Sequence, residues 1–391
     1  MNMADNKRHH YVPKFYLRGF SQDKKSINLL HVKSGKKILG VSLKSQCYRD
    51  YFYGKEDTHE KALGILEGVA AESLRRMVDA RRPPSPHEQD FHTILIFLVV
   101  QSFRTGYQVD AVNEMTDKLL KHLLKEEAMA KSPDLDMSKL TISMKNASNM
   151  NVKSAFISYP LLIDLHWLLV KAVDDDEFVT SDTPVVFVNP LMGGINGMAN
   201  VGIACKGLLL LFPLTPRWSL LMFDKAVYEI PKDFGDATSV DALPTDVVQM
   251  NYLQAASCYE NFYFFRDDLA AEKILAGAKR YRRIRKNTQS VFPGEETEKY
   301  RREIIFNSQE GIVMPLSFSF LKIRRQAIRW RTEFIQKKTR PALVVRDPSL
   351  FRLHNEYREL QKKGGVMPPI DEFLKSRCEQ EKGIDDNGQP Q

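Results

Sequence analysis

The sequence predicts an α+β protein with an N-terminal hairpin, a helical middle and antiparallel strands after residue 178. Near the N-terminus, two strand-like runs flank a turn-forming Lys-Ser-Gly. In the middle of the chain, apolar side chains recur at helical spacing. From Phe178 onward, short apolar runs alternate with turn residues. Strands therefore flank a helical middle, which is typical of an α+β fold and not of an alternating α/β fold.

The N-terminal part begins with Tyr-Val-Pro, an extended entry to the short aromatic helical turn of YVPKFYLRGF, and Pro13 fits the first helical position. The hairpin follows, with strands over residues 27–32 and 37–41. Further strands are predicted over residues 178–180, 185–188, 207–212, 219–223 and 262–265.

Helices are predicted where caps and apolar spacing agree. The segment Ser85-Pro86-His87-Glu88 is a start signal, with Ser85 as N-cap, proline at the first position and glutamate at the third. The predicted helices cover residues 57–80, 85 to beyond Arg104, 109–129, 154–173, 245–259, a segment after Asp268, and the basic run 322–331.

Length and composition bound the organisation of the chain. With 391 residues it is too long for one simple core, so we expect one large domain with an appendage, or two domains. Hydrophobic residues make up 43%, which argues against wholesale disorder. The net charge of +8 permits a polyanionic partner such as nucleic acid but does not require one.

The cysteines and the N-terminal segment indicate the cellular compartment. The four cysteines are far apart and form no CxxC pair, so neither a cysteine zinc site nor a disulfide is expected. The N-terminal segment MNMADNKRHHYV has no apolar stretch of the kind found in signal peptides. The most apolar helical run, Ile94–Val100, is about a third of the length that a bilayer needs. We expect a cytoplasmic protein with no membrane partner.

His9 and His10 are the first candidates for chemistry. Adjacent histidines can supply a general base or a metal ligand near neutral pH. HNH-type nucleases also begin a motif with such a pair, but they need further ligands on a short helix, and the next histidines here have no such spacing. Alternatively, both histidines anchor the N-terminus through hydrogen bonds.

Gln101 and Arg104 are the second candidates. They are three residues apart on an apolar predicted helix, so they share one face. A guanidinium in apolar surroundings must be paired or must face a cleft, and it suits a phosphate or a carboxylate. Alternatively, Arg104 forms a buried ion pair with no ligand.

Ser181 and Asp182, within Thr180-Ser181-Asp182-Thr183-Pro184, are the third candidates. A carboxylate at the end of a strand is a frequent place for metal binding or acid–base work. Alternatively, Asp182 closes a turn by bonding its own backbone. The glycine-rich loop over residues 192–202 lacks the Lys-Ser/Thr of a phosphate-binding loop and is expected to be a surface loop.

These segments together resemble a bacterial family, domain of unknown function 4238. The resemblance covers residues 9–270 and rests mainly on HHYVPKFYLRGF and FVTSDTPV. It implies a family-like α+β domain over residues 9–270, followed by a basic, partly helical extension over 271–391. Weaker matches are QSFRT, PLTP, Asn251 and YENFYFF. It implies an architecture and site positions and no activity. The positions it implies are His9, His10, Arg18, Gln101, Arg104, Ser181 and Asp182.

Basic residues after the family-like region suggest a nucleic-acid interface. Tyr281 and Trp330 place aromatic rings among them, which suits stacking on bases. A solvated charged face is the alternative. The candidate nucleic-acid-binding residues are Arg282, Arg283, Arg285, Lys286, Arg325 and Arg329.

Two classes of function remain open. The first is a hydrolase or nuclease, acting in bacterial defence against phage or mobile elements, with a divalent metal as the cofactor it would use. In this hypothesis His9 and His10 act as base or ligand, Asp182 supplies a carboxylate and Arg104 clamps phosphate. We then expect these three segments to converge on one site. The second class is a non-catalytic nucleic-acid-binding or protein-binding module. The sequence does not predict the oligomeric state.

Overall fold

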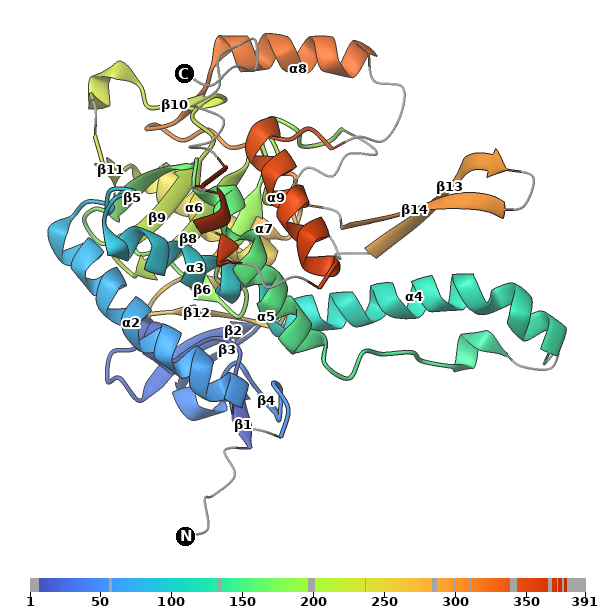
Figure 1. The fold of residues 1–391 in the computed structure, drawn as a ribbon. Coiled ribbons are helices and arrows are strands. Elements are labelled where there is room, and N and C mark those ends of the chain that lie inside the picture. The colour runs from blue at the N-terminus through green and yellow to red at the C-terminus, as the bar shows by residue number, and fades with distance from the viewer. Residues whose placement is uncertain are drawn as a thin grey trace.

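The protein is described by a computed structural model (Figure 1). Side chains are described throughout the ranges below except in residues 125–130 and 287–309. The described residues are 7–55, 58–131, 136–195, 201–235, 237–282, 287–297, 300–309, 311–337, 343–364, 368–370, 372–374, 376 and 377.

A five-stranded sheet forms the centre of the molecule. Its neighbours are antiparallel except for the pair β11·β5, which is parallel. The α+β prediction, with mostly antiparallel strands after residue 178, is confirmed. In spatial order the strands are β11 (Ser239–Ala242), β5 (His166–Ala172), β9 (Trp218–Phe223), β8 (Leu209–Thr215) and β7 (Val186–Val188).

Both faces of this sheet are buried. Along β8, Leu210 and Phe212 belong to one hydrophobic core, and the alternating Leu209 and Leu211 belong to a second. Strand residues point alternately to the two faces, so a sheet covered on both sides needs continuous apolar strands. This explains why the strands read as unbroken apolar runs.

A second, four-stranded antiparallel sheet joins the N-terminal hairpin to strands from much later in the chain. Strand β12 pairs with β2 on one side and with β6 on the other. The predicted hairpin is confirmed as β2 and β3. The strands in order are β3 (Lys36–Ser42), β2 (Ser26–His31), β12 (Asn261–Phe264) and β6 (Thr180–Ser181).

Short elements complete the N-terminal part of the chain. Strand β1 (Arg8–His10) pairs with β4 (Tyr48–Asp50), and between them lie α1 (Lys14–Leu17) and the 3-10 turn Leu43–Ser45. We call residues 7–55, which contain these elements and the β2–β3 hairpin, the N-terminal lobe.

Helices cover both faces of the central sheet. On the first face, α2 (Thr58–Ala80), α3 (Gln89–Phe103) and α5 (Ala147–Ser158) pack together. On the second face lie α6 (Pro244–Ser257) and α7 (Ala271–Ala278). In Figure 1, α4 (Gly106–Lys131) and the ribbon of β13 (Asn287–Thr297) and β14 (Tyr300–Gln309) extend away from this body.

The boundaries of α3 differ from those predicted. Ser85–Glu88 forms a turn in which the Glu88 carboxylate accepts a hydrogen bond from the Ser85 N–H, so Glu88 and not Ser85 precedes the helix. The helix also ends at Phe103, and Arg104 is its C-cap with φ −95° and ψ 7°. The chain therefore bends at Arg104 before α4 begins.

The predicted helix over residues 154–173 is wrong. Helix α5 occupies residues 147–158, a 3-10 turn with Pro160 near its start follows, and β5 begins at His166. The segment His-Trp-Leu-Leu-Val is apolar because β5 lies inside a sheet buried on both faces. A short apolar run of this kind does not distinguish a buried strand from a buried helix.

Residues 311–377 return to the body of the protein. Ile312 and Phe320 join one core, and Leu353 of α9 (Pro348–Lys362) joins the other. Arg346 is 5% exposed; its guanidinium pairs with the Asp164 carboxylate and also donates to backbone carbonyls. The final segment is thus held by both apolar packing and a nearly buried ion pair.

The basic run over residues 322–331 is only partly helical. Lys322 lies in β15 (Lys322–Ile323), which pairs with β10 (Tyr228–Glu229), and α8 spans Arg325–Lys337. The predicted helix over residues 322–331 is therefore wrong at its start, because the backbone of Lys322 pairs in a strand ladder. In the part of the chain that the structure describes, no helix is long and apolar enough to cross a membrane.

Two helical glycines give a test of this packing. A Cβ at Gly277 of α7 would lie 2.2 Å from Tyr252 Cζ of α6, whereas a Cβ at Gly64 of α2 meets nothing within 4 Å. We expect Gly277→Ala to lower the free energy of unfolding by about 1–3 kcal/mol through overpacking. The matched Gly64→Ala should raise it by about 0.5–1 kcal/mol, because alanine loses less backbone entropy in a helix. Urea denaturation measures both, and equal effects would contradict the α6–α7 contact.

Candidate functional site

His9 is buried against the end of the N-terminal lobe. It is 1% exposed, its Nδ1 accepts a hydrogen bond from the Tyr53 N–H at 3.1 Å, and its ring stacks on the Tyr53 ring. This contact fixes the path of the chain at the β1–β4 pair.

His10, its neighbour, is half-buried at the surface of the same lobe. Its Nδ1 donates to the Gln46 carbonyl at 2.9 Å. Burial, followed by the charges of Lys14 and Arg8, lowers the pKa of His10 to about 4. The imidazole is therefore neutral at pH 7, and it lies beside two cations.

Arg104 is one of the largest fully buried side chains, at 1% exposed. Its Nε and Nη2 donate to Gln101 Oε1, and its Nη1 donates to Glu67 at 2.7 Å. Gln101 in turn donates to the backbone carbonyl of Tyr11 at 3.0 Å. Arg104 and Gln101 thus meet, as their spacing predicts, and they tie α3 to the HHYVPKF segment and to α2.

Asp182 is 2% exposed and accepts hydrogen bonds from three consecutive backbone N–H groups, those of Tyr259, Glu260 and Asn261. Burial raises the pKa of Asp182, and the three donors oppose this rise. Ser181 donates to Gln254 of α6 at 3.0 Å. Both side chains hold the turn after β6 against the loop between α6 and β12.

The three motifs surround one aromatic residue, Tyr11. Its backbone carbonyl accepts from Gln101, and burial, followed by the nearby groups Cys47 and Asp182, raises the pKa of its hydroxyl. Arg104 lies next to Tyr53, on which His9 stacks. The motifs are therefore neighbours, but each polar group already has a protein partner.

The remaining position implied by the resemblance, Arg18, is exposed on the lobe, and its backbone carbonyl accepts from Lys24. Among the described residues, no group of three or more His, Cys, Asp or Glu side chains is placed to hold a metal ion. The divalent metal of the nuclease hypothesis thus has no donor set in this part of the chain.

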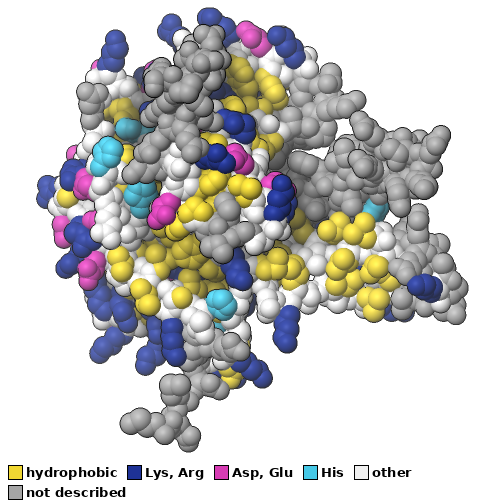
Figure 2. Space-filling model, viewed as in Figure 1, with side chains coloured by type: hydrophobic (Ala, Val, Ile, Leu, Met, Phe, Trp, Pro, Cys, Tyr) yellow, Lys and Arg dark blue, Asp and Glu magenta, His cyan; other side chains and the backbone are white. Residues whose placement is uncertain are grey.

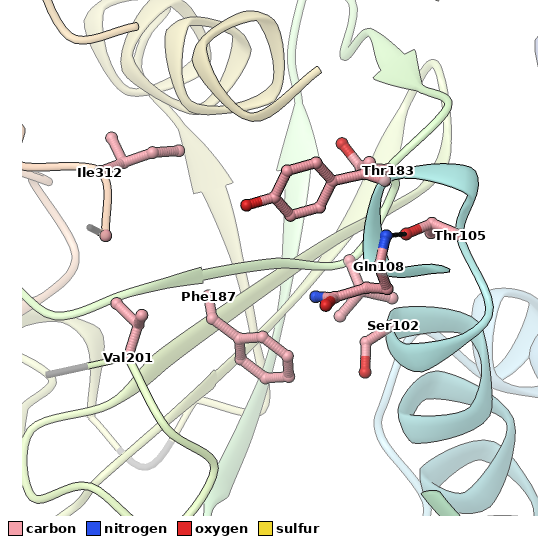
Figure 3. A pocket seen from close by; sticks show the side chains of 10 residues that line it. Ser102, Thr105, Gln108, Thr183, Phe187, Val201 and Ile312 are labelled. Carbon is pink, nitrogen blue, oxygen red and sulfur yellow. Dashed lines mark hydrogen bonds between the residues drawn. The ribbon is translucent and has the colours of Figure 1, made fainter. Parts of the chain in front are cut away.

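A cleft of about 90 Å³ lies beside these motifs, where the bend between α3 and α4 faces the turn after β6 (Figure 3). None of the six predicted catalytic residues lines it. Three of its lining residues, Ser102, Thr105 and Thr183, are adjacent in sequence to a predicted catalytic residue. The lining residues are Ser102, Thr105, Tyr107, Gln108, Thr183, Val185, Phe187, Val201 and Ile312, with Gly311.

The cleft has a neutral polar side and an apolar side. Ser102, Thr105, Gln108 and Thr183 bring three hydroxyls and an amide, and Phe187 and Ile312 lie across from them in Figure 3. The backbone N–H of Gln108 donates to Thr105 Oγ1, the interaction drawn in the figure. The side-chain amide of Gln108 makes no hydrogen bond with any described residue. Within the described lining, the Gln108 amide therefore offers unused donor and acceptor capacity, and no side chain is charged.

Sequence reasoning missed the cleft residues although it selected their neighbours. Ser102 and Thr105 flank the buried Arg104 within two positions, and Thr183 follows Asp182. The available signal was the bend itself: Thr105-Gly106 interrupts the helical pattern between α3 and α4, so side chains next to it point into space between elements.

Cations gather around Tyr259, whose ring contacts the cleft residue Tyr107 edge-on. Lys33 Nζ lies 5.9 Å from the centre of the Tyr259 ring, and Arg282 Nη2 donates to the Tyr259 carbonyl at 3.1 Å. Arg49 forms a two-bond ion pair with Asp110, which also accepts from the Tyr259 hydroxyl. The cleft is thus bordered by a cationic, aromatic surface.

The predicted C-terminal interface is placed only in part. Arg325 and Arg329 are exposed on α8, whereas Trp330 packs against the core and stacks on Phe334. Arg282 is half-buried at Tyr259, as described above. The residues Arg283, Arg285 and Lys286 lie outside the described part of the chain.

Together these features define an α+β protein in which motif residues form a buried polar network beside a small neutral cleft. A family model described as "Protein of unknown function (DUF4238)" matches residues 8–268, about two thirds of the chain. The chain belongs to this family, as the motifs predict. No curated protein and no solved structure matched the chain significantly.

The role of Arg104 gives a second test. Arg104→Met leaves Gln101 Oε1 and the Glu67 carboxylate without their guanidinium partner, so we expect the free energy of unfolding to fall by about 3 kcal/mol. The matched control is Arg76→Met, which removes an exposed pair with Asp90 at the surface of α2. An exposed pair contributes little, so this variant should unfold near the wild-type midpoint. An Arg104 variant as stable as the control would contradict a structural role.

His10 gives a test with pH. The lowered pKa of His10 means that the unfolded chain binds a proton more readily than the folded protein. Stability is therefore unaffected above the ordinary histidine pKa of about 6.5 and falls as the pH drops towards 4. His10→Asn keeps a donor for the Gln46 carbonyl and does not titrate. We expect the urea midpoint of this variant to fall less than that of the wild type between pH 7 and pH 4.5. An equal fall of the two midpoints over this pH range would contradict the prediction.

Proposed function

We propose that this protein binds nucleic acid and that the N-terminal lobe is its main binding surface. The observation that supports this is charge: residues 7–55 contain twelve Lys and Arg side chains against two Asp and no Glu. Such a density of one sign creates a field that attracts polyanions and provides phosphate contacts independent of sequence.

Both acidic side chains of the lobe are occupied. Asp50 pairs with Lys7 at 2.9 Å, and the Asp23 carboxylate accepts from the backbone of Lys25 and Ser26 in a local turn. Apart from Lys7, the exposed cations of the lobe are therefore not neutralised by a carboxylate of the lobe. Figure 2 shows Lys and Arg side chains gathered at the lower left, over the lobe and α2.

Three of these cations lie close together and are exposed. Lys14 and Arg18 are four residues apart on successive helical turns, and the 3-10 turn that carries Lys44 contacts α1. No salt bridge within the described residues involves any of them. They are the positions at which a phosphate backbone gains most from contact with the lobe.

The basic C-terminal segment is a weaker candidate. Residues 271–391 hold 26 basic side chains but also 16 acidic ones. Helix α8 lies at the opposite end of the molecule from the N-terminal lobe in Figure 1, so the two regions do not form one continuous face. The predicted role of Arg325 and Arg329 is separable from the role of the lobe.

A salt titration tests this proposal. For single strands, log affinity falls with log salt by about 0.7 per neutralised phosphate. Replacing Lys14, Arg18 and Lys44 with Gln should reduce the magnitude of that slope by about 2 and weaken binding at low salt. The matched control, Arg325→Gln with Arg329→Gln, should leave both unchanged. Fluorescence anisotropy with a labelled oligonucleotide measures them.

The outcomes separate the alternatives. If only the α8 variant loses affinity, the C-terminal interface is the binding surface. If the wild type binds no oligonucleotide at low salt, the proposal fails. If the protein binds anionic lipid vesicles as tightly as the oligonucleotide, the proposal of nucleic acid is replaced by that of an anionic membrane surface.

A second candidate function is phosphodiester hydrolysis, favoured by one observation. His10 is a neutral imidazole whose tautomer is fixed by the Gln46 carbonyl, and it lies beside Lys14 and Arg8. A neutral imidazole next to cations suits a general base acting on a bound phosphodiester. In this form of the nuclease hypothesis His10 acts, while His9, Arg104 and Asp182 support the fold. Its role in bacterial defence stays a prediction from the sequence.

Purified protein incubated with RNA and DNA, with and without divalent metals, tests the second candidate. Cleavage that His10→Ala abolishes, with an unchanged urea midpoint, is the expected result. Cleavage that survives in the variant, or none in the wild type, contradicts it.

A further inference from the structure

The neutral cleft beside the motifs is not explained by phosphate binding. Phosphate contacts position a strand but do not read its bases, and none of the lining side chains that the structure describes carries a charge at neutral pH. A ligand group that enters the cleft must therefore be neutral, flat enough to lie against Phe187, and able to form hydrogen bonds along one edge.

The size of the cleft suits a group larger than one water molecule. A cavity needs about 10–15 Å³ to hold a water, and this cleft measures about 90 Å³. Its apolar residues Val185, Phe187 and Ile312 favour displacement of water by an apolar face. Its hydroxyls and the Gln108 amide favour a polar edge.

Gln108 is the residue that would form hydrogen bonds with the polar edge of the ligand. Its amide offers both donor and acceptor, and neither is used within the described part of the chain. In nucleic-acid complexes a glutamine amide pairs in two bonds with the N6 and N7 edge of adenine. Figure 3 shows the Gln108 side chain between Ser102 and Thr183, facing the side on which Phe187 lies.

The cleft also lies next to the cationic surface. Tyr107 is in the cleft lining, its ring contacts Tyr259, and Tyr259 is bordered by Lys33 and Arg282. A backbone phosphate held at these cations would bring the attached base to the cleft. Single-stranded nucleic acids are recognised in this way, with bases splayed onto aromatic side chains and bonded at their edges.

We propose that the cleft binds one unstacked base of a single-stranded nucleic acid, with adenine preferred through Gln108. This inference rests on the proposed function, because the N-terminal lobe holds the strand from which the base is presented. It adds a base preference that the charge of the lobe does not supply.

The test compares oligonucleotides of equal charge. We use twelve-nucleotide single strands of adenine, of thymine and of abasic sites, with affinity measured by anisotropy at low salt. One base–aromatic stack with edge hydrogen bonds gives about tenfold or more in affinity. The wild type should therefore bind the adenine strand at least about tenfold more tightly than the abasic strand, with thymine between them.

Two substitutions at the partly exposed Gln108 distinguish the contribution of hydrogen bonds to the base edge from the contribution of the space in the cleft. Gln108→Leu should bring the adenine affinity down to that for thymine and leave the abasic affinity unchanged. Gln108→Trp fills the cleft and should bring all three strands to the abasic affinity. The matched control, Gln326→Leu on the exposed face of α8, should retain the wild-type order.

The failures are distinguishable. Equal affinity of the wild type for the adenine and abasic strands overturns the base-binding inference and leaves the proposed phosphate binding intact. A wild-type adenine preference that persists in Gln108→Leu and Gln108→Trp also overturns it. Absence of salt-dependent binding to every strand overturns both proposals.

Discussion

The carboxylate of Asp182 holds together the parts of the chain on which the rest of the structure depends. Three consecutive N–H groups, those of residues 259–261, converge on it, so the turn after β6 is fixed to the loop that leads from α6 into β12. Strand β12 then pairs with the N-terminal strand β2. Burial of a carboxylate is costly, and here the backbone donors compensate for the lost water. The same contact positions both Tyr259 and the cleft residue Thr183.

A second buried polar network, centred on Arg104, holds the helices together, as the hydrogen bonds of Asp182 hold the strands together. Arg104, at the bend between α3 and α4, joins Gln101 and Glu67 and thereby connects α3, α2 and the Tyr11 segment. A buried guanidinium that loses a partner destabilises the fold, so the network specifies one arrangement of the bend. Because the bend forms one wall of the cleft, residues that never touch a ligand still determine the shape of the site.

The buried polar groups and the exposed charged groups of this protein have different roles. The buried polar groups of the motifs, Gln101, Arg104, Ser181 and Asp182, are paired within the protein, whereas the N-terminal lobe presents cations that, apart from Lys7, have no acidic partner on the lobe. The proposed function uses these cations, and the inferred base site uses the side-chain amide of Gln108, which makes no hydrogen bond with any described residue. Structural and binding roles are in this way divided between adjacent residues, such as Asp182 and Thr183, or Arg104 and Thr105.

The sequence alone determined the fold class, the hairpin, most element positions and the family, because periodicity, caps and motifs are local signals. It also selected the residues that join the segments, including Arg104, Asp182 and His9. Only the tertiary structure decided that β5 is a strand, since burial on both faces hides the alternation that identifies one. Only the tertiary structure assigned Arg104 and Asp182 to internal partners and Gln108 to the cleft. A motif shows which residue types occur together, whereas whether a polar side chain meets protein or solvent depends on elements distant in sequence that fold against it.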